Sequence, residues 1–121
     1  MNNKGQTLVV FVLILPVLLF IFTLVIDIGF VSISKRNINN NLYDASKYYL
    51  NNIEDIEVES KTKKLLNKNI EDIDEIIIED KGSYISINLK KDIKGIYSFI
   101  SNIEIDLTYK VIKESKEIIK G

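Results

Sequence analysis

Residues 4–29 read KGQTLVVFVLILPVLLFIFTLVIDIG, and within them residues 8–26 form an apolar run broken only by one proline and one threonine. A helix over residues 6–30 would be about 38 Å long, against about 30 Å for the hydrocarbon core of a bilayer. Each central Leu, Ile, Val or Phe favours insertion by about 0.3–0.6 kcal/mol, and together they outweigh the cost of about 3 kcal/mol for one acid, Asp27. We therefore predict a transmembrane helix over residues 6–30.

Composition narrows the range of functions for the rest of the chain. The 121 residues carry a formal net charge of −1, with 16 basic and 17 acidic side chains, so the charge predicts no nucleic-acid partner. The absence of Cys and His removes disulfides, thiolate chemistry and the commonest general base and metal ligand. The acidic runs in 54–59 and 71–80 match no calcium-binding loop and favour a solvated surface. We expect a protein that is not an enzyme, with no metal, no cofactor and no small-molecule substrate.

The sequence on either side of the apolar run indicates that the run is retained as an anchor. Residues 1–5 form a short polar leader, but no small-residue cleavage pattern follows the run, which is also longer than the apolar region of an ordinary secretory signal. Positive side chains lie on both sides, with Lys4 before the run and Lys35 and Arg36 after it. The distribution of positive charge therefore leaves the orientation open.

Five residues in or beside the run are candidates for packing against other helices: Pro16, Thr23, Asp27, Gly29 and Ser34. The proline should bend the helix, either as a tolerated membrane proline or as a kink used in packing. The acid either reaches water at the membrane interface or belongs to a polar stripe that contacts another subunit. That stripe lies on one helical face and consists of Phe20, Thr23, Asp27, Val31, Ser34 and Asn41. The glycine would permit close approach of a second backbone.

The helical period continues beyond the membrane. Apolar residues recur at spacings of three to five, at Phe30, Ile33, Ile38, Leu42, Ala45, Tyr49 and Ile53. We therefore predict one helix from residue 6 to about residue 52, with its first half in lipid and its second half amphipathic. A second, short helix is expected over about residues 60–70, with Leu65, Leu66 and Ile70 as its apolar contacts.

The period then changes to two, which is typical of strands. We expect strands over 74–80, 84–89 and 103–111, with a turn at 80–83, a short helix over 92–102 capped by Asp92, and a charged tail. The predicted fold class is α+β: a long N-terminal helix packed on a small three-stranded antiparallel sheet. The predicted organisation is a leader over 1–5, a transmembrane helix over 6–30 and an extracytoplasmic α+β domain over 31–121.

Several segments near the N-terminus follow one another in a recognisable order: GQTLVVF at 5–11, LPVLL at 15–19, IDIG at 26–29, NINN at 37–40 and DASKYY at 44–49. Together they resemble the signature of the TadE/TadG-like proteins, which serve assembly of Flp-type (tight-adherence) pili. The resemblance covers about the first 50 residues; the remainder is similar only in general layout.

This resemblance implies a minor type IV pilin-like subunit, or pseudopilin, in a bacterial cell membrane. It implies a single pass with the N-terminus cytoplasmic and the domain outside, possible incorporation into a pilus, and other pilins and inner-membrane platform proteins as partners. In processed members a prepilin peptidase cuts after the leader glycine, here between Gly5 and Gln6. Those members often carry Glu at the fifth mature position, where this chain has Val10. The departure fits either an uncleaved TadG-like relative or a minor subunit that enters assembly differently.

An alternative function is a signal-anchored binding module of the envelope, or an accessory subunit of another membrane complex. In that case Gly5 would remain uncut, and the face of the sheet would carry the function.

Overall fold

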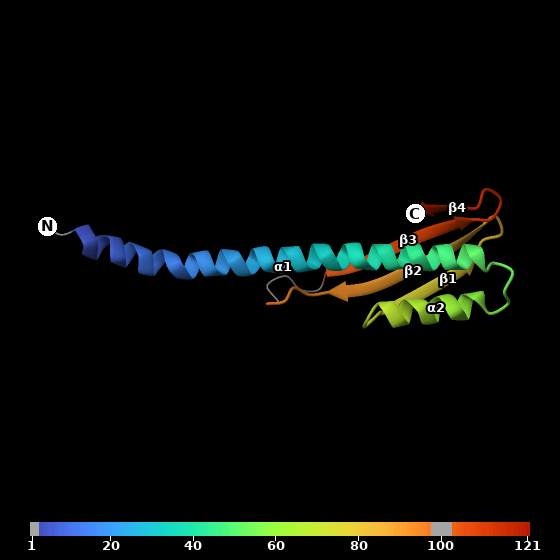
Figure 1. The fold of residues 1–121 in the computed structure, drawn as a ribbon, viewed down its shortest axis with the longest axis horizontal. Coiled ribbons are helices and arrows are strands. Elements are labelled where there is room, and N and C mark those ends of the chain that lie inside the picture. The colour runs from blue at the N-terminus through green and yellow to red at the C-terminus, as the bar shows by residue number, and fades with distance from the viewer. Residues whose placement is uncertain (1–2, 98–102) are drawn as a thin grey trace.

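The computed structural model describes residues 3–97 and 103–121, and its architecture is the predicted α+β arrangement (Figure 1). The elements in chain order are α1 (Asn3–Asn51), α2 (Val58–Asn69), β1 (Glu75–Asp80), β2 (Tyr84–Ile93), β3 (Ile103–Ile112) and β4 (Glu117–Lys120). The helix α1 extends well beyond the sheet, so the first half of the helix stands clear of the rest of the described chain (Figure 1).

The predicted long helix is confirmed as α1, which is 49 residues long and runs unbroken through Pro16. The helix changes direction only gently in its N-terminal third, where this proline lies (Figure 1). The large apolar side chains from Leu8 to Ile26, apart from the half-buried Leu24, are each 42–67% exposed. The described chain therefore leaves this half of the helix uncovered except at Thr23 and Leu24, which are half-buried.

The second half of α1 buries a stripe of residues against the sheet. Ile38, Leu42, Ala45 and Tyr49 are buried as predicted, but Phe30 and Ile33 are 41% and 67% exposed, so their assignment to this stripe was wrong. The buried positions in that region are instead Val31 and Asp27. At about 100° per residue, seven positions bring a side chain back to nearly the same face, whereas five turn it well away. The buried stripe thus steps from Ile38 back to Val31.

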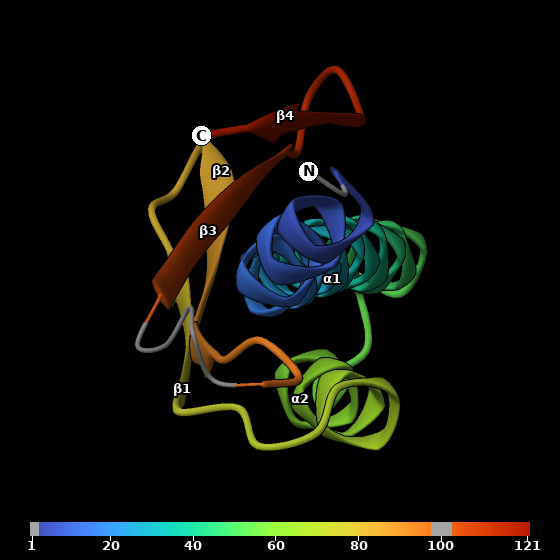
Figure 2. The ribbon, with the colours of Figure 1, turned by 90° about the vertical axis from the view of Figure 1, so that its left-hand side faces the viewer.

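The sheet is an antiparallel meander with strand order β1-β2-β3-β4. Both helices lie on one face of the sheet (Figure 2). Alternation puts Ile85, Ile87 and Leu89 of β2 on that inner face, where all three are buried as predicted. From β3, the Tyr109 hydroxyl donates a hydrogen bond of 2.7 Å to Asn39 Oδ1 of α1, which adds a polar tie to the apolar contact.

Two predictions for the second half of the chain were wrong. The charged tail contains a fourth strand, β4, in which Ile118 pairs with Val111 of β3. The turn before it uses Lys116 at a φ of 54°, and a strand of four residues is too short to show a clear period of two. The expected helix over 92–102 is absent at residues 92–97, because β2 continues to Ile93, opposite Ile103. Residues 98–102 lie outside the described part of the chain.

The connections of the domain fall into two groups at opposite ends of the sheet. The links from α2 to β1 and from β2 towards β3 lie at the end nearer the exposed half of α1, and the other turns lie at the far end (Figure 1). After β2, residues 94–97 reach along α1 towards its N-terminal half (Figure 1). This placement brings the end of β2 to the last residues of the apolar run.

Candidate functional site

The place where the apolar run meets the domain is built around Asp27. This side chain is completely buried, and its Oδ1 accepts a hydrogen bond of 2.8 Å from the backbone N–H of Tyr97. Gly95 lies directly against it: a Cβ added at Gly95 would be 2.3 Å from Asp27 Cγ and 2.7 Å from Asp27 Cβ. Real Cβ atoms do not approach other atoms that closely, so only glycine fits here. We call Asp27, Gly95 and Tyr97 the junction.

The junction follows from how β2 ends. Ile93 is buried and is the last residue of the strand, after which the chain leaves the sheet and crosses to α1. Because Gly95 has no side chain, the backbone packs directly against the helix. The amide of Tyr97, two residues later, then donates its hydrogen bond to the Asp27 side chain. Because Asp27 is buried, this hydrogen bond is shielded from water and fixes the loop on the helix.

The junction gives the buried acid of the apolar helix a partner within its own chain. Sequence reasoning offered water or another subunit as the partner of Asp27, and the chain's own loop was the option it missed. Gly95 lies eight residues before Ile103, where the clearest strand pattern begins, and 68 positions from the acid, and no local pattern pairs it with Asp27. Contact of the polar stripe with another subunit stays a prediction.

The other predicted packing residues lie in different surroundings. Thr23 is half-buried, and its Oγ1 donates a hydrogen bond of 2.7 Å to the Phe20 carbonyl of the same helix. Ser34 is half-buried on the side facing the domain. Gly29 is half-buried, and a Cβ there would meet nothing within 4 Å, whereas Pro16 is exposed. The structure thus brings Asp27 and Ser34 to the domain and leaves Pro16 and the Cβ side of Gly29 open to a partner.

The candidate cleavage position lies at the opposite end of the exposed half of α1. Gly5 and Gln6 are both exposed and already helical, because α1 begins at Asn3. No atom lies within 4 Å of a Cβ placed on Gly5. The peptide bond between them is therefore not covered by the described chain, and cleavage there stays a prediction.

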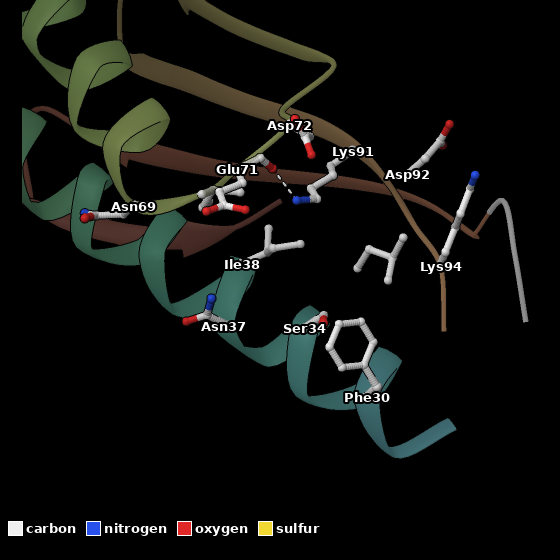
Figure 3. Close-up of a pocket in the computed structure, with 12 residues that line it drawn as sticks. Phe30, Ser34, Asn37, Ile38, Asn69, Glu71, Asp72, Lys91, Asp92 and Lys94 are labelled. Carbon is white, nitrogen blue, oxygen red and sulfur yellow. Dashed lines mark hydrogen bonds between the residues drawn. The ribbon is translucent and has the colours of Figure 1, made fainter. Parts of the chain in front are cut away.

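A hollow of about 600 Å³ lies between α1, the end of α2 and the end of β2 (Figure 3). The Lys91 Nζ crosses it to donate a hydrogen bond to the Glu71 carbonyl oxygen. Charged groups of both signs line the hollow, together with four residues of α1; the lining residues are Phe30, Ser34, Asn37, Ile38, Asn69, Ile70, Glu71, Asp72, Lys91, Asp92, Ile93 and Lys94. Sequence reasoning missed this hollow because three segments far apart in the chain form it.

The far end of the domain carries exposed ion pairs. Lys61 Nζ lies 2.7 Å from Asp55 Oδ2, and hydrogen bonds from Lys61 and from the Glu57 amide lower the pKa of Asp55. Asp80 Oδ1 accepts hydrogen bonds from the Gly82 N–H at 2.9 Å and from Lys113 Nζ at 3.0 Å, and these lower its pKa as well. Within residues 3–97 and 103–121, no three acidic groups converge as they would at a metal site.

One helix of the described chain is long and apolar enough to cross a membrane. No protein-family model, no curated protein and no solved structure matches the chain. The geometry of the exposed half of α1 and of the junction therefore carries the functional argument.

Proposed function

We propose that the chain is a non-enzymatic, single-pass, pilin-like subunit of the TadE/TadG-like kind. It would take part in assembly of a Tad/Flp-type pilus through helix packing of its membrane segment. The observation that carries the proposal is the division of α1 into two halves. The second half packs against the sheet on one side, whereas the first half is a mostly apolar rod over residues 4–26, in which all side chains but the half-buried Thr23 and Leu24 are exposed.

Such a rod needs an apolar environment. At about 25 cal/mol per Å² of apolar surface, exposure of the whole rod to water would be very unfavourable. Lipid supplies the cover while the chain is a single molecule in the membrane, and helices of neighbouring subunits supply it in an assembly. The segments at 5–11 and 15–19 that resemble the pilus-assembly signature lie within this rod, as expected if helix packing is the function.

The junction supports the same proposal, because it fastens the domain to the helix at the end of the rod. Subunits whose rods pack side by side would then hold their domains at set positions. The proposed topology places the N-terminus in the cytoplasm and residues 31–121 outside the membrane of a bacterium. The proposed partners are the membrane, other pilins and pseudopilins, inner-membrane platform proteins and a prepilin peptidase acting between Gly5 and Gln6.

Cysteine cross-linking tests the packing directly, because the natural chain contains no cysteine. Single variants Leu13→Cys and Leu19→Cys place a thiol on the exposed rod, and Ile56→Cys places one on a residue 98% exposed at the far end of the domain. In cells that assemble the pilus, oxidation of the rod variants should give cross-linked products. These products should be absent from cells that lack the other pilus genes. The proposal fails if the rod variants give no more cross-linked product than Ile56→Cys.

Intact mass measurement tests the processing step separately. Co-expression with the prepilin peptidase of the same bacterium should yield a chain that begins at Gln6, and a Gly5→Val variant should keep its full mass. A wild-type chain that retains Met1, while a known prepilin is cut in the same cells, would overturn cleavage at Gly5 and leave the cross-linking result to decide on packing.

The second candidate function, a signal-anchored binding module, is favoured by the hollow beside Lys91. Its open shape and mixed charge suit a polar ligand or a peptide. Under this alternative the rod serves only as an anchor. An uncut chain without rod cross-links is the result that would favour it.

A further inference from the structure

We propose that the loop formed by residues 94–97 is a second membrane contact of the protein. In this arrangement Ile96 and Tyr97 rest at the boundary between lipid headgroups and acyl chains. The domain would then touch the bilayer through this loop as well as through α1. The inference rests on α1 crossing the bilayer and does not depend on a role in a pilus.

The junction determines the depth of the loop. From Leu8 to Asp27 the helix rises about 29 Å, close to the thickness of about 30 Å for the hydrocarbon core. If Leu8 lies at one boundary of the core, Asp27 lies at the other. The Tyr97 amide is 2.8 Å from Asp27 Oδ1, so this part of the loop lies at the same depth as the helix residue.

The side chains of the loop suit that depth. Ile96 and Tyr97 are 58% and 52% exposed, although both are large and at least partly apolar. Tyrosine is enriched at membrane–water interfaces, because its ring is apolar and its hydroxyl is polar. Lys94, two residues before Ile96, is exposed, and in this arrangement its amine would reach lipid phosphate while its stem lies along apolar surface.

Lipid is the occupant that the surroundings favour. The loop lies beside the end of an apolar helix surface that is itself exposed, since Val25, Ile26 and Ile28 are 43–59% exposed. The loop and this helix surface therefore face the same medium. A second copy of the chain seated on the loop is the competing occupant, and the experiment below separates the two.

Tryptophan fluorescence tests the inference in the full chain, because the natural sequence contains no Trp. Tyr97→Trp keeps the backbone N–H that binds Asp27, and Ile96→Trp provides a second probe. Each variant is placed in lipid nanodiscs, with lipids brominated at a shallow acyl position as quenchers. Ile56→Trp, at the exposed far end of the domain, is the matched control, and Leu18→Trp in the apolar run reports insertion of the helix.

We expect the shallow brominated lipid to quench the Tyr97→Trp and Ile96→Trp probes several-fold more than Ile56→Trp, with one chain per disc. Quenching of Leu18→Trp by deeply brominated lipid, with both loop probes behaving like Ile56→Trp, would overturn the loop inference and leave the membrane span intact. Absence of quenching at Leu18 as well would overturn both. If the loop probes are shielded from water only when a disc holds more than one chain, the loop contacts a second copy, and this result would also overturn the inference.

Discussion

The Asp27 side chain leaves no room for a methyl group on Gly95, whose Cβ would lie 2.3 Å from Asp27 Cγ. We therefore expect Gly95→Ala to push residues 94–97 away from α1. The Tyr97 amide would lose its acceptor, and its hydrogen exchange in detergent micelles should quicken markedly. Amide exchange measured by NMR checks this expectation.

Gly29→Ala is the matched control for that substitution. It adds a methyl group to α1 two residues from Asp27, but the new Cβ would meet nothing within 4 Å. The isolated chain should keep its Tyr97 protection and gain up to about 1 kcal/mol from the better helix propensity of alanine. If the two variants change exchange at Tyr97 equally, contact between Gly95 and Asp27 is not what holds the loop.

Two substitutions of Asp27 should show what its side-chain oxygen acceptor contributes to stability. Asp27→Ala leaves the Tyr97 N–H without its acceptor, a loss that costs about 1–3 kcal/mol at a buried position. Asp27→Asn keeps an oxygen acceptor in the same place and should retain most of the protection. Denaturant titration in micelles measures both variants. Equal stability of Asp27→Ala and the wild type would show that the hydrogen bond does not fix the loop.

The inner face of the sheet should be the most sensitive part of the domain. Ile87 is fully buried between the strands and the helices, so Ile87→Ala should lower the free energy of unfolding by about 2–5 kcal/mol. Ile56 is 98% exposed, and Ile56→Ala should change that free energy by less than about 0.5 kcal/mol. Thermal or chemical unfolding of both variants checks the assignment of the core, and similar losses would contradict it.

Asp80 should make stability depend on pH at the acidic end of the range. The Gly82 N–H and the Lys113 ammonium hold its pKa below the ordinary value of 3.8 in the folded state. A lowered folded pKa means that the stabilisation is fully present above the unfolded pKa and is lost as the pH falls through the folded one. Unfolding from about pH 6 down to about pH 2 should show this loss, with a small amplitude because the pair is exposed.

Asp80→Asn is the control for the pH experiment. The amide cannot titrate, so the contribution of this position to the acid dependence should vanish while the carboxylate paired with Lys61, Asp55, keeps its own. An unchanged acid profile in Asp80→Asn would mean that the contact with Gly82 and Lys113 does not favour the ionised form.

Periodicity was enough to predict most of the fold. The apolar run predicts a continuous helix because only Pro16 and Thr23 interrupt the apolar residues from Leu8 to Ile26. Alternation in 84–89 and 103–111 predicts the two central strands with their inner faces. The predicted buried stripe was wrong only at Phe30 and Ile33, whose apolar side chains are exposed in the described structure. Hydrophobicity alone does not tell whether such a residue packs in the core.

The missed features depend on contacts between distant segments. The strand β4 is held by pairing with β3, and β2 continues through Asp92 because β3 lies beside it, whereas the local sequence around Gly95 favours neither outcome. The junction and the hollow likewise need two or three segments to meet. Their residues could be recognised as polar and unusual from the sequence, but their partners could not.

Because α1 is continuous, its two halves move together when the helix tilts. Under the proposed membrane span, with its boundary at Asp27, the helix extends about 36 Å beyond the bilayer to Asn51, and a tilt of about 20°, ordinary for a transmembrane helix, would displace its far end by about 12 Å. The two halves belong to one continuous helix, and the loop from β2 is hydrogen-bonded to it at Asp27. In the proposed assembly, a change in the tilt of the membrane half would therefore displace the whole domain, and the displacement would grow with distance from the bilayer.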